Sequence, residues 1–390
     1  MLRGTYWLFL AAAFTLSSIA SATSPTVGRP IALRLPGGEG IFDPSLADTP
    51  QGRRAWMSFS SVSPSPRWPT RNTRAVTTRL AYSDDSGATW TDLGFVINDI
   101  WESESGADAR TWVNEVSSLV YDRFAPRAER WRLFWHHYLY LNGKGSFQDG
   151  WIAYKAASTP QGLRNAAESK LFVGRGYNAA NDTRFGATGS PLAGKPLVPV
   201  NQLAKELSLC VAASEPTAIA TASGLYLSLS CYRPKGFPLA AMLTGAAEPV
   251  VVLLKCDTPC RPARAGSWRY IATLLRPEDA RAIGAYGYSA SDLFVVGNTF
   301  YIISSPVSNE PVHGSYNGCY VFGFTDIAVG RLDRDSTGPK IARRIAGVPG
   351  SFNGACTYSQ AVSASGFMYG QIEFVAGRPY FQIFQTADTM

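Results

Sequence analysis

One pattern recurs along this chain and narrows the folds that it can adopt. An acidic residue stands just ahead of a short apolar strand, and a turn links that strand to an aromatic-rich one. A repeat of this kind fixes the architecture of a chain, and an acid at the same place in each unit suggests a ring of carboxylates. The acids of the first four units are Asp43, Glu115, Glu215 and Asp292, and a fifth unit without an acid begins at Cys356.

The spacing of these five positions sets the size of each unit. The intervals are 72, 100, 77 and 64 residues, enough for one four-stranded blade each plus insertions. Most of the remaining sequence has the character of short alternating strands between Gly, Pro, Ser, Asn and Asp, and helix signals are confined to 160–167, 200–207 and 277–283. We therefore predict an all-β fold, a five-bladed β-propeller, which closes radially. An early strand at 30–35 is expected to join the last blade.

The first residues have the character of a targeting segment. Residues 1–22 combine a positive start at Arg3, an apolar stretch at 6–16 and small residues at 20–22, which predicts a signal peptide. Residues 23–390 then form a single propeller domain, with the 46% hydrophobic content that a large core needs. We expect a secreted or periplasmic monomer with no stable membrane insertion, and a retained anchor is the alternative.

All six cysteines lie in the second half of the chain. An even count in an exported protein indicates disulfides, although six cysteines allow fifteen connectivities. The pairs that position suggests are Cys256 with Cys260, Cys210 with Cys231, and Cys319 with Cys356. Zinc is the alternative, but the sequence has no CxxC pair and only three histidines, His136, His137 and His313.

The excess of basic residues over acidic ones has two possible explanations. The net charge is +7 and the positive residues are scattered rather than gathered in a run. A solvated basic surface is one explanation, and attraction to acidic glycans or an anionic cell surface is the other. No nucleic-acid motif accompanies the charge, so we expect no nucleic-acid partner.

The segment 83–90, with the sequence SDDSGATW, matches the Asp-box pattern S/T-x-D-x-G-x-T-W. The pattern predicts a tight hairpin in which Asp85 accepts backbone hydrogen bonds, Gly87 takes a positive φ and Trp90 packs into the blade. It is similar to the boxes of sialidases and of many other propellers. In those proteins the box lies away from the active site, so it indicates a hairpin more than a catalyst.

The segment Phe42-Asp43-Pro44-Ser45 is the sharpest functional signal. It resembles the first-blade motif of five-bladed glycoside hydrolases, namely the arabinanase and xylosidase family 43 and its fructan-cleaving relatives. The resemblance implies that Asp43 lies at the central cavity as general base or, in retaining members, as nucleophile. The simpler alternative is that Asp43 caps the turn ahead of Pro44.

Three further carboxylates are candidates. Ser214-Glu215-Pro216 looks like the third-blade motif that carries the general acid in the same family, although the usual Gly is missing. Glu115 stands at the second-blade position, where the family has an Asp that modulates the acid. Asp292 has no fixed role in the family and is a candidate substrate-binding residue. The alternative for each of the three is a structural role, as a solvated carboxylate or as one that supports the fold.

Aromatic residues near these acids could form a platform for sugar rings. Trp112 precedes Glu115, and Tyr288 precedes Asp292, so both are candidate substrate-binding residues, with blade packing as the alternative. We expect no required cofactor and no metal in the catalytic set. The family resemblance leaves one option open, an axial calcium near His313.

These observations favour an exported glycoside hydrolase that acts on an extracellular glycan or oligosaccharide with a carboxylate pair in the axial pocket. One carboxyl would protonate the leaving oxygen, and the other would activate water or attack carbon. A non-catalytic propeller that binds glycan or protein is the first alternative. A sialidase-like enzyme is the second, but its R-I-P motif is not apparent, because residues 29–31 are in the wrong order.

Overall fold

A computed structural model describes most of the chain beyond the amino-terminal segment. The described residues are 28–33, 35, 40–49, 52, 54–64, 74–97, 101–105, 108–141, 144–177, 198–234, 247–264, 266–307, 316, 318–345, 352–362, 366–375 and 378–390. The predicted signal peptide and His313 lie outside them. No helix of the described part has the length and apolar character needed to cross a bilayer.

The chain forms successive antiparallel units, each running from an inner strand outwards. The first unit contains β2 (Gly40–Ala47), β3 (Ala55–Pro64), β4 (Arg74–Ser83) and β5 (Thr91–Ile97). The second contains β7 (Asp108–Tyr121), β8 (Trp131–Leu141), β9 (Lys144–Ala157) and β10 (Ser169–Val173), with β6 (Trp101–Ser105) and β11 (Val198–Pro199) at its edges. The third contains β12 (Ala212–Thr221), β13 (Gly224–Pro234), β14 (Ala247–Asp257) and β15 (Trp268–Leu275).

The last two units complete the chain. The fourth contains β16 (Gly287–Val296), β17 (Thr299–Val307), β18 (Cys319–Asp326) and β22 (Ile341–Ile345), with the short strands β19 (Arg331–Leu332), β20 (Arg334–Asp335) and β21 (Gly338–Pro339) beside it. The fifth contains β23 (Phe352–Tyr358), β24 (Phe367–Val375) and β25 (Arg378–Gln385). Strand β1 (Arg29–Pro30) pairs with β25, so the early strand does join the last unit, as expected.

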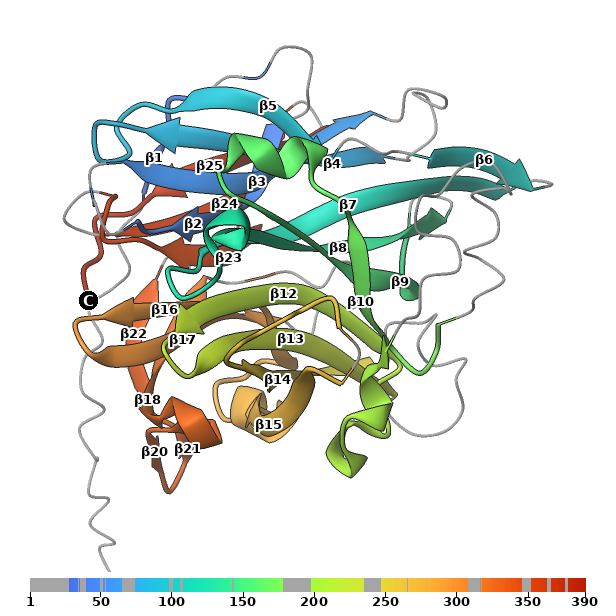
Figure 1. The fold of residues 1–390 in the computed structure, drawn as a ribbon, viewed down its shortest axis with the longest axis vertical. Helices are drawn as coiled ribbons and strands as arrows, with labels where there is room; N and C mark the ends of the chain where they lie inside the picture. The colour runs from blue at the N-terminus through green and yellow to red at the C-terminus, as the bar shows by residue number, and fades with distance from the viewer. Residues whose placement is uncertain are drawn as a thin grey trace, which may run out of the picture.

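The helices are short, as the sparse helix signals predicted. In the part of the chain that the structure describes, they are α2 (Pro277–Arg281) and the 3-10 turns η1 (Arg127–Glu129), η2 (Gln161–Asn165), η4 (Val200–Gln202), η5 (Lys205–Leu207) and η7 (Ile327–Val329). Figure 1 shows the blue strands of the first unit beside the red strands of the fifth. These two units share one sheet because Gly40 of β2 pairs with Phe381 of β25.

The inner strand of each unit bends at the same point. The pairing register with the next strand shifts there, and the extra residue has a left-handed backbone conformation. The five residues are Asp43 (φ 49), Val116 (φ 49), Glu215 (φ 50), Ala290 (φ 46) and Ala355 (φ 50). A left-handed backbone is unfavourable for Val and Ala. The bulge is therefore imposed by the architecture and not by the residue that occupies it.

Hydrogen bonds pass from each inner strand to the next and return to the first. A side-chain oxygen two residues after each bulge accepts a backbone N–H of the following unit. The donor and acceptor pairs are Leu119 N to Ser45 Oγ (3.1 Å), Ala218 N to Ser118 Oγ (3.0 Å), Leu293 N to Thr217 Oγ1 (3.0 Å), Tyr358 N to Asp292 Oδ2 (3.4 Å) and Leu46 N to Thr357 Oγ1 (3.0 Å). We call these five pairs the axial ring.

The apolar core is divided in the same way. One buried cluster lies between each pair of neighbouring units, and the cluster between the fifth and first units completes the circle. Trp56 of the first unit, for example, packs against Trp131 of the second with ring centroids 5.4 Å apart. The all-β propeller is thus confirmed, and from the bulges, the axial ring and the clusters we infer five blades.

Three disulfides reinforce the second half of the propeller. They join Cys210 to Cys231, Cys256 to Cys260, and Cys319 to Cys356, which are the pairs that position in the sequence suggested. The last of these links β18 of the fourth unit to β23 of the fifth.

Candidate active site

Asp43 stands at the bulge of β2, where the left-handed backbone turns its side chain away from the ladder. The residue is only 5% exposed, and Ser60 of the neighbouring strand donates a hydrogen bond of 3.0 Å to its Oδ2 atom. Burial raises the pKa of Asp43 well above its usual range, and the nearby charge of Glu115 raises it further, against the lowering effect of Ser60.

Glu215 stands at the equivalent bulge of β12 and is also 5% exposed. Three donors surround its carboxylate. Tyr316 donates to Oε1 at 2.9 Å, the backbone N–H of Ala290 donates to Oε2 at 2.8 Å, and the Ser289 hydroxyl also donates to Oε2. Two of the donors come from the next inner strand, so the carboxylate is held across a blade boundary.

Glu115 lies one residue before the bulge of β7, where Val116 takes the position that Asp43 and Glu215 have in their strands. Its Oε2 atom accepts a hydrogen bond from the Tyr138 hydroxyl of β8. Burial raises the pKa of Glu115 to about 7; the Tyr138 bond opposes this, and the charge of Glu215 adds to it. A carboxyl with this pKa is about half protonated at neutral pH.

The structure therefore brings together the three residues predicted to be catalytic. The charge of Glu215 raises the pKa values of both Asp43 and Glu115, and the charge of Glu115 raises that of Asp43. Carboxylates that repel one another in a buried site hold protons more tightly than isolated ones. Repulsion of this kind separates the pKa values of neighbouring carboxyl groups, which is the arrangement that acid-base hydrolysis of a glycosidic bond uses.

Asp292 does not stand with these three residues. It lies two positions after the bulge of β16 and belongs to the axial ring. Its carboxylate accepts hydrogen bonds of 2.7 Å from both the Thr217 and the Thr357 hydroxyls. Burial raises its pKa to about 6, against the lowering effect of these bonds. The idea of four acids at one repeated place therefore needs correction: only Asp43 and Glu215 are equivalent, and Glu115 and Asp292 are displaced by one and two residues.

The axial ring lines a small space on the propeller axis. Its volume is about 20 Å³, and Asp43, Ser45, Ser118, Thr217 and Asp292 are among the residues that border it. A space of this size holds about one water molecule. The ring residues therefore form a narrow floor beside the bulge residues.

Trp112 and Tyr288, the two aromatic residues expected to bind substrate, lie in the core. Trp112 is 3% exposed and stacks on His137 with ring centroids 5.4 Å apart. Tyr288 is 2% exposed and packs edge-on against Phe322. In the structure both side chains do what the alternative interpretation proposed, which is to fill the blades.

Other aromatic residues border the carboxylates. Tyr138 and Tyr316 bind Glu115 and Glu215 through their hydroxyls, and the half-buried Phe352 packs against Tyr316 at 5.0 Å and against Phe42 at 6.0 Å. Sequence reasoning missed these residues. The available signal was weak: Tyr138 follows the histidine pair by one residue, and Tyr316 and Phe352 belong to no motif.

His137, one member of the histidine pair, is structural in character. His137 is buried between Trp112 and Trp151, and its Nδ1 atom is 2.7 Å from Asn114 Oδ1. Burial lowers the pKa of His137 to about 3. Among the described residues, no three or more His, Cys, Asp or Glu side chains are placed to hold a metal ion. We therefore derive no step through calcium or any other metal.

The hairpin at 83–90 has the geometry that its motif predicted. Asp85 accepts hydrogen bonds from the Thr89 N–H at 2.9 Å and from the Thr89 and Ser83 hydroxyls at 2.6 and 2.7 Å. These bonds lower the pKa of Asp85 to about 2. Gly87 has a φ of 84°, and Trp90 is buried. The hairpin connects β4 to β5, at the opposite end of the blade from the site.

A solved structure that matches with a TM-score above 0.5 supports the propeller fold. A family 32 glycoside hydrolase from Bifidobacterium adolescentis superposes with a TM-score of 0.51 at 13% identity, over 92% of this chain and 57% of that one. An arabinanase from Bacillus subtilis has a TM-score of 0.45 at 10% identity, over 88% of this chain and 93% of that one. A family 62 α-L-arabinofuranosidase from Coprinopsis cinerea has a TM-score of 0.45 at 11% identity, over 94% of this chain and 96% of that one. This chain thus spans little more than half of the first structure. No protein-family model and no curated protein matches the sequence.

Proposed function

We propose that this protein is a glycoside hydrolase whose catalytic carboxylates are Asp43, Glu115 and Glu215. The observation that carries the proposal is the meeting of three carboxyl groups from three different inner strands, two buried and one half-buried. The charge of Glu215 raises the pKa values of Asp43 and Glu115, and that of Glu115 raises the pKa of Asp43. Two opposed carboxyl groups are what glycoside hydrolysis needs. Burying such groups has a cost in folding free energy, which a purely structural role would not explain.

Each carboxylate has a proposed role. Asp43 acts as general base or nucleophile, and Glu215 donates the proton to the leaving oxygen. Glu115, with a pKa of about 7, is the modulating group: when it is protonated, it removes a negative charge from beside the other two. The hydrogen bond from Tyr138 fixes where that proton resides.

The charge of the site points to a neutral sugar as the group that is cleaved. The charged neighbours that shift the pKa values of Asp43 and Glu115 are other carboxylates. A carboxylate-rich centre repels a carboxylated sugar and stabilises the positive charge that develops on the sugar ring in the transition state. This favours a neutral glycan over the sialic acid of the sialidase-like alternative.

Substrate screening followed by a leaving-group comparison tests this function. The mature protein is incubated with neutral furanoside and pyranoside oligosaccharides, and active substrates are compared with aryl glycosides that carry a good leaving group. Loss of the proton donor in Glu215→Gln should abolish cleavage of the oligosaccharide but spare much of the cleavage of the aryl glycoside. Asp43→Asn should lose both. An equal loss of cleavage rate on both substrates in Glu215→Gln would show that Glu215 is not the general acid.

A non-catalytic glycan-binding propeller is the second candidate. The observation in its favour is the low exposure of Asp43 and Glu215, 5% each. It predicts that a neutral oligosaccharide binds without turnover and that Asp43→Asn keeps the affinity.

We also propose that the protein is exported. Three disulfides support this, because such bonds persist in oxidising compartments. Mass spectrometry of the amino terminus after expression would test cleavage near residue 22.

A further inference from the structure

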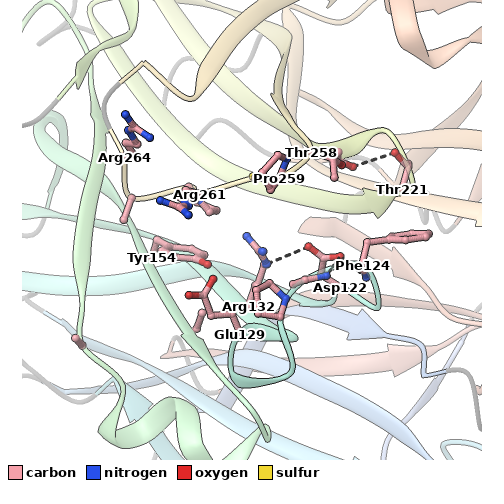
Figure 2. Close-up of a pocket in the computed structure, with 18 residues that line it drawn as sticks. Asp122, Phe124, Glu129, Arg132, Tyr154, Thr221, Thr258, Pro259, Arg261 and Arg264 are labelled. Atoms are coloured by element: carbon pink, nitrogen blue, oxygen red, sulfur yellow. Dashed lines mark hydrogen bonds and ion pairs between the residues drawn. The ribbon is translucent and has the colours of Figure 1, made fainter.

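A second cleft lies at the other end of the blades from the carboxylates. It has a volume of about 730 Å³ and is bordered by the β7–β8 connection, the end of β9 and the segment 258–264 after β14 (Figure 2). Along β8, His136 pairs with Glu115 and Arg132 pairs with Val120, and the four-residue step from Arg132 to His136 spans about 13 Å of strand. The cleft is therefore separate from the proposed catalytic site.

A buried arginine forms the floor of this cleft. Arg132 is 1% exposed, and its Nε atom lies 3.1 Å from Asp122 Oδ2. Its Nη1 atom is buried and has no hydrogen-bond partner among the described residues. Figure 2 shows the guanidinium between Asp122 and Tyr154, facing the segment that carries Pro259 and Arg261. A buried guanidinium with an unused donor is costly unless an acceptor can reach it.

The rim of the cleft adds positive charge. Arg261 and Arg264 border it and are exposed. Asp122 is already paired with Arg132, and Glu129 is the other acidic residue among those that border the cleft. The side chains that face the cleft therefore carry a surplus of one positive charge, three arginines against two acids.

The cleft also offers an apolar face. Phe124 is 41% exposed on the rim, and Pro126, Pro259 and Pro262 line the walls. An exposed aromatic ring beside charged groups is suited to the C–H face of a sugar. The volume lies within the range of small-molecule sites, roughly 300–1,000 Å³.

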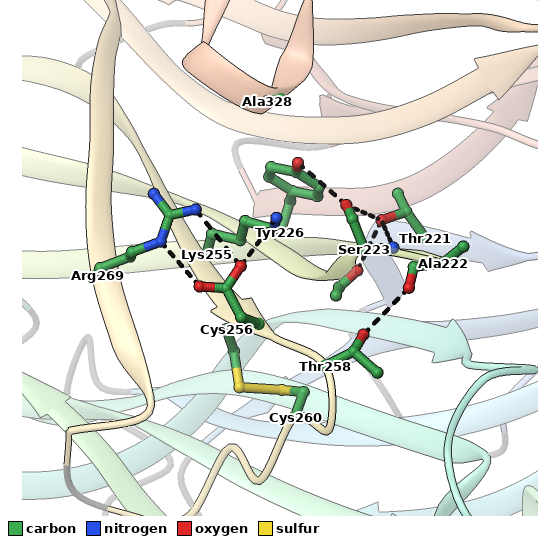
Figure 3. Close-up of polar contacts among 12 residues, drawn as sticks. Thr221, Ala222, Ser223, Tyr226, Lys255, Cys256, Thr258, Cys260, Arg269 and Ala328 are labelled. Atoms are coloured by element: carbon green, nitrogen blue, oxygen red, sulfur yellow. Dashed lines mark hydrogen bonds and ion pairs between the residues drawn. A yellow bond between two sulfur atoms is a disulfide. The ribbon is translucent and has the colours of Figure 1, made fainter.

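The wall at 258–264 is held in place before any ligand arrives. The Cys256–Cys260 disulfide closes its base, Thr258 donates a hydrogen bond of 3.2 Å to the Ala222 carbonyl, and Trp268 Nε1 donates to the Pro262 carbonyl at 3.0 Å. Figure 3 shows the disulfide and the Thr258 contact beside the Lys255 and Arg269 side chains. A fixed wall lowers the entropy cost of binding.

We propose that this cleft binds an acidic oligosaccharide, with a carboxylate or sulfate group on the arginines and a sugar ring against Phe124. The oxyanion accepts hydrogen bonds from Arg261 and Arg264, and the positive charge of the buried Arg132 beneath them adds to its attraction. The site anchors the protein on an acidic polysaccharide, at the opposite end from the carboxylates. Its existence does not depend on the proposed hydrolysis, because binding can be measured in the Asp43→Asn variant.

Calorimetry on the full chain tests the proposal with three probes, which are trigalacturonate, a sulfated disaccharide and neutral cellotriose. We expect at least one acidic probe to bind about tenfold or more tightly than cellotriose, and its affinity to fall as NaCl rises. The carboxylate and sulfate arms identify which oxyanion the cleft prefers. Equal binding of all three probes, or no binding of either acidic one, would overturn the proposal.

Surface variants then locate the binding. The double variant Arg261→Gln with Arg264→Gln should lower the affinity for the acidic probe about fivefold or more. Glu129→Gln removes a negative charge from the rim and should raise that affinity. Arg331→Gln, an exposed arginine of β19 outside the cleft, is the matched control and should leave the affinity unchanged. All these residues are exposed, so folding is preserved. An unchanged affinity in the double variant would contradict the placement.

Discussion

Asp43 and Glu215 occupy the same position in two different inner strands. Both stand at a bulge, with φ values of 49° and 50°, and both carboxyls are almost fully buried. The other three equivalent positions hold Val116, Ala290 and Ala355. The architecture thus offers five equivalent bulge sites, and this chain places acids at two of them, in the first and third blades.

The pH dependence of stability should change when Glu115 becomes glutamine. The folded-state pKa of Glu115, about 7, lies above the value of about 4.3 for an unfolded chain. Its contribution is therefore fully present below pH 4 and is lost as pH rises towards and through 7. Glu115→Gln avoids that loss, so its free energy of unfolding relative to the native protein should rise with pH, by on the order of 1–3 kcal/mol.

Urea denaturation at pH 4.5, 6 and 8 measures this difference. Glu129→Gln, at an exposed site, is the control for the loss of one carboxylate. A Glu115→Gln difference that falls between pH 4.5 and 8 would mean that the carboxyl is ionised and stabilised in the folded state.

The axial ring should contribute measurably to stability. Thr217 accepts the Leu293 N–H and donates to Asp292, so Thr217→Val leaves a buried N–H and a buried carboxylate each short of one partner. Loss of such partners costs about 1–3 kcal/mol. Thr337→Val removes an exposed hydroxyl contact to Asp335. It should change the free energy of unfolding by less than about 0.5 kcal/mol. Equal losses of stability in the two variants would show that the axial ring does not stabilise the fold.

The disulfides should differ in what they contribute. Cys319 and Cys356 are separated by 37 residues, and Cys256 and Cys260 by 4. In the chain-entropy model the longer loop gives about 2 kcal/mol more stabilisation. Replacing both cysteines of each pair with alanine and measuring the free energy of unfolding tests this. A larger loss from the shorter loop would show that local strain or packing outweighs loop entropy.

Much of the fold was accessible from the sequence. The units follow the predicted spacing because turn residues separate alternating strands, and the four acids and Cys356 each fall in the inner strand of a different unit. The 83–90 hairpin was predictable because its side chains bond locally. The suggested cysteine pairs match the structure, but position alone could not decide among the possible pairings.

The arrangement within the site was less accessible. A bulge adds a residue that only the pairing register reveals, so Glu115 and Asp292 could not be distinguished from Asp43 and Glu215 by spacing. Trp112 and Tyr288 looked suited to sugar, but their burial depends on how neighbouring blades pack. The Tyr138 and Tyr316 hydroxyls belong to other strands and loops, and their contacts with the acids arise only from the tertiary fold.

The most direct test of the account compares hydrolysis by the native protein, Asp43→Asn and Asp48→Asn. Each is assayed on the best substrate from the neutral panel, with circular dichroism and melting temperature as checks of folding. The account predicts that Asp43→Asn folds normally and loses at least about 1,000-fold in kcat/KM, and that Asp48→Asn, five residues further along and bonded to Ser359, keeps most of its activity. A folded Asp43→Asn variant with native hydrolysis would contradict it.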